Sequence, residues 1–270
     1  MTSTTLQLSE PYGQVAYRDT GTGAPVLLIH GVGMQSASWG PQIDTLSATH
    51  RVIAVDIPGH GGSDPLPEAA ELPDFVAWLF AVVTALDLGP VSLAGHSMGA
   101  LIAGGFAAEY PNMVARVAVV NGVYRRNAAA RAAVEARAAE IKQGKVDLET
   151  PLTRWFGDSA QDQIARDQVA GWLSAVDMSG YATAYGAFAR GDSTYADAWG
   201  RVTCPMLALT GDGDPNSTPE MSQAMAAAAQ NGAAKVITGH RHMVNLTAPN
   251  EVTAILQDWL SRSLTQRRTA

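Results

Sequence analysis

Residues 95–99 read Gly-His-Ser-Met-Gly and stand between the apolar run PVSLA (90–94) and the small-residue run ALIAGGFAAEY (100–110). The first run is typical of a buried strand, and the second has the length of a helix. A tight strand-to-helix turn exposes a serine hydroxyl, and glycines on either side give that turn room. The following helix N-terminus favours negative charge that develops on a substrate. We therefore predict that Ser97 is a nucleophile, the alternative being a turn residue that only packs a helix on a strand.

Short apolar runs recur along the chain, each bounded by Gly, Pro or Asp, at 26–30, 51–57, 91–96, 114–121, 206–212 and 234–239. Segments of helical length lie between them, at 36–48, 73–88, 98–110, 217–230 and 249–263. Strands without polar alternation are buried on both faces, and alternation with helices indicates crossover connections. We therefore predict an α/β fold with a mostly parallel, twisted sheet of about eight strands and helices on both faces. The alternating opening stretch, 4–21, predicts an antiparallel hairpin at the sheet edge.

Residues 123–200 interrupt this rhythm, because they contain no convincing strand and carry nine of the 18 aromatic residues. We predict a helical cap over 123–199, inserted after the sixth strand between two segments of an α/β core, 1–122 and 200–270. The aromatic side chains either form a small core within the cap or line an apolar wall of a binding pocket.

Composition excludes several classes of protein. The net charge of −7 and the absence of a dense basic cluster argue against a nucleic-acid partner. No apolar run reaches the roughly 18 residues of a membrane span, and the first ten residues lack the features of a secretory signal. Cys204 is the only cysteine, which excludes an internal disulfide and cysteine-based zinc sites. We expect a cytoplasmic monomer or homodimer that needs no metal or cofactor and acts on a small molecule.

An acid and a histidine follow the last two predicted strands. The loop GDGDPNSTP (211–219) offers Asp212 and Asp214, and the loop HRHMVNLTAP (240–249) offers His240 and His242. The carboxyl ends of parallel strands meet at one edge of a sheet, and Ser, Asp and His follow one another in the order of an α/β-type triad. These loops predict a Ser-His-Asp hydrolase site.

Five motifs together resemble the α/β-hydrolase fold superfamily over nearly the whole chain: HGVG (30–33), DIPGHGGSD (56–64), GHSMG (95–99), GDGDPNSTP (211–219) and HMVNLTAP (242–249). The resemblance implies that the acid is the residue before the proline, Asp214, and that the base is His242. It also implies an oxyanion hole formed by the backbone N–H groups of Val32 and Met98.

The remaining histidines have structural interpretations. We expect His30, His60 and His96 to be structural, and His240 to be an incidental loop residue. Thr247 stands where members of the superfamily often have glutamate, a departure that we expect to affect loop packing rather than chemistry.

Two other classes of protein compete with this assignment. The stretch HGVGMQS approaches a dinucleotide-binding fingerprint, but Ser36 stands where that pattern needs its third glycine. A non-catalytic receptor could keep the hydrolase scaffold to bind a small ligand. Serine at position 97 excludes the dehalogenase and epoxide-hydrolase branches of the superfamily, which use aspartate there.

The cap sequence, above all residues 172–192, is most similar to 3-oxoadipate enol-lactonase-like serine hydrolases. This resemblance implies hydrolysis of a small, carboxylate-bearing ester or lactone through an acyl-enzyme. The alternatives are a C–N bond, as in amidomethylene succinates, a C–C bond, as in meta-cleavage products, and broad carboxylesterase activity. A small anionic substrate calls for a cation, and the cap offers Arg125, Arg126, Arg154 and Arg190. We further predict that Gly31, Trp155 and Tyr185 contact the substrate.

Overall fold

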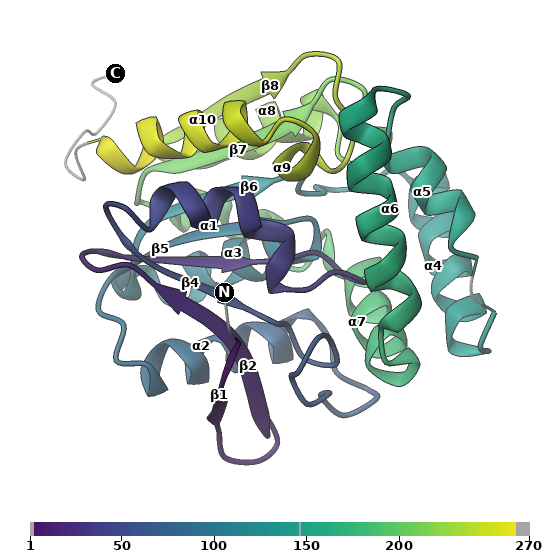
Figure 1. The fold of residues 1–270 in the computed structure, drawn as a ribbon, viewed down its shortest axis with the longest axis horizontal. Helices are drawn as coiled ribbons and strands as arrows, with labels where there is room; N and C mark the ends of the chain where they lie inside the picture. The colour runs from purple at the N-terminus through teal and green to yellow at the C-terminus, as the bar shows by residue number, and fades with distance from the viewer. Residues whose placement is uncertain (1–2, 146, 263–270) are drawn as a thin grey trace.

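The computed structural model describes residues 3–145 and 147–262 (Figure 1). Its centre is an eight-stranded sheet with the strand order β1-β2-β4-β3-β5-β6-β7-β8. The strands are β1 (Thr4–Gln7), β2 (Gln14–Thr20), β3 (Pro25–Ile29), β4 (Arg51–Val55), β5 (Val91–His96), β6 (Val114–Val120), β7 (Met206–Gly211) and β8 (Gly232–Ile237). The hairpin β1–β2 pairs antiparallel with β4, and every pairing from β4 to β8 is parallel. The α/β class, the mostly parallel sheet and the edge hairpin are therefore as predicted.

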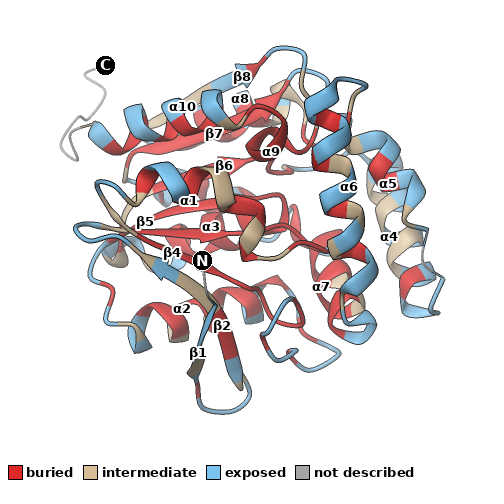
Figure 2. Ribbon diagram, in the orientation of Figure 1, coloured by how far each residue is buried: buried red, intermediate tan, exposed pale blue. Residues whose placement is uncertain are grey.

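Helices cover both faces of the sheet, because the strands present apolar side chains on both sides. One face carries α1 (Gly40–Leu46) and α10 (Pro249–Ser261). Trp39, directly before α1, and Trp259 of α10 belong to the same buried apolar cluster. The other face carries α2 (Leu72–Ala85), α3 (Met98–Glu109) and α8 (Pro219–Ala228), which belong to a second and larger cluster. Figure 2 shows the central strands buried and the outer helix faces exposed.

Four helices lie between β6 and β7: α4 (Ala128–Lys142), α5 (Glu149–Trp155), α6 (Ala160–Ala175) and α7 (Met178–Gly191). A 3₁₀ helix, Ala196–Arg201, leads back to β7. Polar side chains cap three of these helices, since Asn127, Ser159 and Asp177 each accept a hydrogen bond from a backbone N–H of the first turn. The four helices gather at one end of the sheet (Figure 1). The cap boundaries at 123 and 199 stay a prediction.

Some predicted elements begin or end elsewhere. The segment 36–48 divides into a 3₁₀ helix, Ser36–Trp39, and α1, because Pro41 favours the start of a new helix. The last strand begins at Gly232, two residues before the predicted start, and much of it is only half-buried because it forms the sheet edge. Within the described residues, no helix is long and apolar enough to cross a bilayer.

Candidate active site

Ser97 occupies a strained turn between β5 and α3. Its backbone has φ 54° and ψ −113°, a left-handed conformation that L-residues seldom adopt. A Cβ on Gly95 would lie 2.0 Å from the Gly99 carbonyl oxygen, and a Cβ on Gly99 would lie 2.2 Å from the Ile29 oxygen. Only glycine fits at these two positions, which explains the spacing of the motif.

The loop after β3 packs directly against this turn. A Cβ added to Gly31 would lie 2.9 Å from the Ser97 Cβ, so the loop approaches the serine as closely as a glycine allows. The backbone N–H groups of Val32 and Met98 form no hydrogen bond within the described part of the chain. Met98 follows Ser97 in the chain, and Val32 lies in the loop beside it. Both N–H groups are therefore available to a substrate oxyanion.

Asp214 and His242 lie beside Ser97, although the three residues come from loops after three different strands. The His242 Nε2 lies 3.1 Å from the Ser97 Oγ, and the His242 Nδ1 lies 2.7 Å from the Asp214 Oδ2. All three side chains are buried. The arrangement lets Asp214 orient the imidazole, whose free nitrogen then accepts the serine proton.

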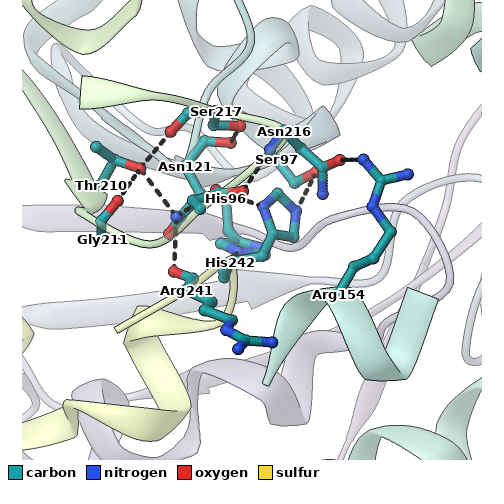
Figure 3. A network of polar contacts seen from close by, with 11 residues as sticks. His96, Ser97, Asn121, Arg154, Thr210, Gly211, Asn216, Ser217, Arg241 and His242 are labelled. Atoms are coloured by element: carbon teal, nitrogen blue, oxygen red, sulfur yellow. Dashed lines mark hydrogen bonds and ion pairs between the residues drawn. The ribbon is translucent and has the colours of Figure 1, made fainter. Parts of the chain in front are cut away.

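Asn121, at the end of β6, was missed by sequence reasoning. Its Nδ2 donates to the Asp214 Oδ2 at 2.8 Å, and its carbonyl oxygen accepts from the Ser217 Oγ at 2.6 Å (Figure 3). Burial raises the pKa of the Asp214 carboxyl, but the charge of His242 and the hydrogen bonds from His242, Asn216 and Asn121 outweigh it, so this pKa lies below its usual value. The available signal was an asparagine at the carboxyl end of a buried strand.

Three other histidines are buried and neutral. Burial lowers the pKa of His30 to about 4 and those of His60 and His96 to about 3. The His60 Nε2 accepts from the Gly33 N–H at 2.8 Å and so holds the loop that carries Val32. The His96 Nε2 donates to the His242 carbonyl oxygen at 2.9 Å and so braces the loop that carries His242. These residues have the structural contacts expected of them.

His240 is not an incidental loop residue. Its Nδ1 lies 2.9 Å from the Thr247 Oγ1, so it contacts the residue that departs from the usual superfamily pattern. Asp212 is also structural, because its Oδ1 accepts from the Gly239 N–H at 2.7 Å on the exposed side of the loop. The neighbours of Asp214 and His242 therefore brace the two loops.

A cavity of about 240 Å³ opens above Ser97 and His242. Its walls include Val32 from the loop after β3, Trp155 of α5, Tyr181, Tyr185 and Phe188 of α7, and Met221 of α8, together with side chains of α4 and of the loop after β7. Trp155 stacks on His242, with ring centroids 5.6 Å apart and an interplanar angle of 30°. The aromatic residues of this segment thus contribute to a binding wall as well as to the apolar core.

Three arginines line the cavity: Arg126, Arg137 and Arg154. Within the described residues, no aspartate or glutamate lines it. The three arginines surround Tyr185. Burial raises the pKa of its hydroxyl, and all three guanidinium charges oppose this rise. Sequence reasoning named Arg126 and Arg154 but missed Arg137, which lies on α4 in an alanine-rich stretch.

Two predicted substrate-binding arginines lie elsewhere. Arg125 is exposed and pairs with Asp197, outside the cavity wall. Arg190 pairs with Glu71 at 3.2 Å and lines a separate groove between α4 and α7. Each has an acidic partner on the surface, which draws its side chain away from Ser97. Within the described residues, no group of three or more His, Cys, Asp or Glu side chains is arranged to hold a metal ion.

The sheet, the strained serine turn and the hydrogen-bonded relay of Ser97, His242 and Asp214 define an α/β-hydrolase type of protein. Residues 26–255 match the alpha/beta hydrolase family, and the chain belongs to this family. The protein is a hydrolase.

Known proteins resemble the chain along most of its length. It is 54% identical over 260 residues to the (E)-2-((N-methylformamido)methylene)succinate hydrolase of Acinetobacter baylyi, covering 96% of this chain and 98% of that protein. A thermophilic esterase from Thermogutta terrifontis, solved with malate bound, superposes with a TM-score of 0.86 at 26% identity over 96% of this chain and 98% of its own. The enol-lactonase from Burkholderia xenovorans has a TM-score of 0.84 at 22% identity, covering 93% of this chain and 100% of its own. At that identity the enol-lactonase likeness shows the shared fold alone.

Proposed function

We propose that this hydrolase cleaves the acyl C–N bond of a small amidomethylene succinate. The observation that carries the proposal is the charge of the cavity: among the described residues, three arginines and no carboxylate line the space above Ser97 and His242. The hydrolase from Acinetobacter baylyi and the malate-bound esterase support a dicarboxylate as the ligand. This choice places the C–N alternative ahead of the ester, lactone and C–C alternatives.

Two of the three cavity arginines are available for the two carboxylates of such a substrate. Arg126 is buried and pairs with the buried Asp192 at 3.3 Å, a carboxylate that Arg131 also contacts at 3.1 Å, so the Arg126 guanidinium is held within the protein. Arg137 reaches Asp147 only at 3.9 Å, and that carboxylate is half-exposed. Arg154 makes no ion pair within the described residues. Arg137 and Arg154 are therefore the cations that we assign to the substrate.

The reaction follows from the relay. Ser97 attacks the acyl carbonyl carbon while His242 Nε2 takes its proton, and Asp214 stabilises the imidazolium. The N–H groups of Val32 and Met98 stabilise the oxyanion. His242 then protonates the leaving nitrogen as the C–N bond breaks, which leaves an acyl ester on Ser97. Water, deprotonated by His242, releases the carboxylic acid.

The leaving nitrogen suits such a site. In an amidomethylene succinate the nitrogen is attached to a C=C bond that is conjugated with a carboxyl group. The electron pair released by C–N cleavage spreads into this conjugated system, which lowers the barrier compared with an alkyl amide. A serine relay without a metal ion thus has sufficient chemistry for the step.

Turnover with a synthetic amidomethylene succinate tests the proposal, with loss of the conjugated enamide absorbance as the readout. We expect saturable turnover by the wild-type protein and a loss of at least about 10³-fold in kcat in Ser97→Ala. No turnover by the wild-type protein, or substantial turnover by Ser97→Ala, would contradict it.

A further inference from the structure

Arg154 differs from the other arginines in the segment 123–200. Six of the seven pair with an aspartate or glutamate within 4 Å: Arg125, Arg126, Arg131, Arg137, Arg166 and Arg190. Within the described part of that segment, Arg154 alone has a neutral partner instead. Its Nη2 donates to the Asn216 side-chain oxygen at 2.7 Å (Figure 3).

Asn216 lies on the loop that carries Asp214. Its backbone N–H donates to the Asp214 Oδ1 at 2.8 Å, and the next residue, Ser217, donates to the Asn121 carbonyl oxygen. The Asn216 backbone is therefore fixed relative to the Ser-His-Asp relay. Its half-buried side chain lines the same cavity as Arg154, so its amide oxygen is a fixed acceptor at the rim.

The neutrality of this partner has a physical consequence. An amide oxygen holds a long, flexible guanidinium in place and reduces the rotamer entropy that substrate binding would otherwise cost. It leaves the positive charge uncompensated. An arginine–carboxylate pair is ionised on both sides and often bidentate, which makes it stronger than the single bond from arginine to a neutral amide. An incoming carboxylate can therefore replace the amide, whereas it would have to compete with an aspartate at the same position.

We propose that Asn216 is a specificity-determining, positioning residue: it presents Arg154 at the cavity, orders its side chain, and leaves its charge available for one substrate carboxylate. This inference rests on the proposed function, because it requires a dicarboxylate ligand. It adds that selectivity for the anion depends on a neutral residue of the acid loop as well as on the arginines.

The variant Asn216→Asp separates this role from a merely structural one. Aspartate has nearly the same shape and keeps the acceptor for Arg154, so a structural role predicts equal or greater thermal stability and unchanged ligand binding. A specificity role predicts that the new ion pair neutralises Arg154. Succinate serves as the probe, and its inhibition constant is measured against hydrolysis of a neutral ester, p-nitrophenyl acetate.

We expect the succinate inhibition constant to rise at least tenfold in Asn216→Asp without a fall in Tm. The matched control is Asn127→Asp, which adds a carboxylate to the wall of the same cavity and preserves the α4 N-cap. The control should raise the constant less than threefold. An equal rise in both variants indicates a general field effect and overturns the assignment to Asn216.

Two negative results are distinguishable. If succinate inhibits the wild-type protein and Asn216→Asp equally, the role of Asn216 is wrong and the proposed function stands. If succinate does not inhibit the wild-type protein at all, the dicarboxylate function fails and the role of Asn216 fails with it.

Discussion

The contact between Gly59 and Gly180 joins α7 to the turn that carries His60. A Cβ built on Gly180 would lie 2.4 Å from the Gly59 Cα and 2.6 Å from its carbonyl oxygen. Carbon atoms in contact normally lie about 3.5–4.0 Å apart, so Gly180→Ala requires α7 or the turn to withdraw by about 1 Å. Both neighbours are backbone atoms, which cannot move aside as a flexible side chain can.

Gly171→Ala in α6 is the matched control, because no described atom beyond its chain neighbours and its own helix backbone lies within 4 Å of the added Cβ. Overpacking costs about 1–3 kcal/mol, of which the better helix propensity of alanine offsets up to about 1 kcal/mol at position 180. At position 171 the propensity gain, about 0.5–1 kcal/mol, is unopposed. We therefore expect Gly180→Ala to be less stable than Gly171→Ala by about 2 kcal/mol.

Urea unfolding followed by circular dichroism measures this difference, and thermal unfolding should separate the two Tm values by roughly 4–8 °C. Because His60 accepts from the Gly33 N–H, displacement of the turn should also lower kcat in Gly180→Ala. Equal stability of the two variants would refute the close backbone contact as a constraint on α7.

Three further predictions concern the relay, the cavity and pH. Asp214→Asn should lower kcat by about 10³–10⁴-fold in steady-state assays with little change in KM, and a loss below tenfold would contradict the orienting role of this carboxylate. Arg154→Ala should raise KM for a dicarboxylate substrate at least tenfold while Arg190→Ala changes it less than twofold, and equal effects would remove Arg154 from the binding site. The free energy of unfolding should fall as pH drops from 7 to 5. The buried histidines His30, His60 and His96 have pKa values of about 3 to 4 in the folded protein and near 6.5 in the unfolded chain. The unfolded chain therefore binds protons first, which costs roughly 2 kcal/mol of stability for each histidine at pH 5. Urea titrations at the two pH values measure this loss, and a flat profile would contradict it.

The fold was largely predictable because its signals are local. Apolar runs bounded by turn residues located the strands. The Gly-x-Ser-x-Gly motif, the acid loop and the histidine loop each follow a predicted strand, in the order expected of a Ser-Asp-His triad. The structure then brought Ser97, Asp214 and His242 within hydrogen-bond reach. These three are predictable because parallel strands carry their carboxyl-end loops to one edge of the sheet.

The cavity wall was less predictable because it depends on which way each helix faces. Nothing local distinguishes Arg154, whose partner Asn216 lies 62 residues away, from Arg190, which pairs with Glu71 outside the cavity. Arg137 was missed for the same reason, since its alanine-rich surroundings have little amphipathic pattern to orient α4. Tertiary packing decides which side of each helix faces the cavity, and a single sequence contains little information about that packing.

The most direct measurement compares kcat/KM of the wild-type protein for an amidomethylene succinate and for its neutral dimethyl ester, with cleavage of the amide bond as the readout in both cases. A serine relay beneath Arg137 and Arg154 should prefer the diacid at least 100-fold, and Arg154→Ala should reduce that preference at least tenfold. Equal amide cleavage in the two compounds, or a preference for the diester, would contradict a site built for a small dicarboxylate.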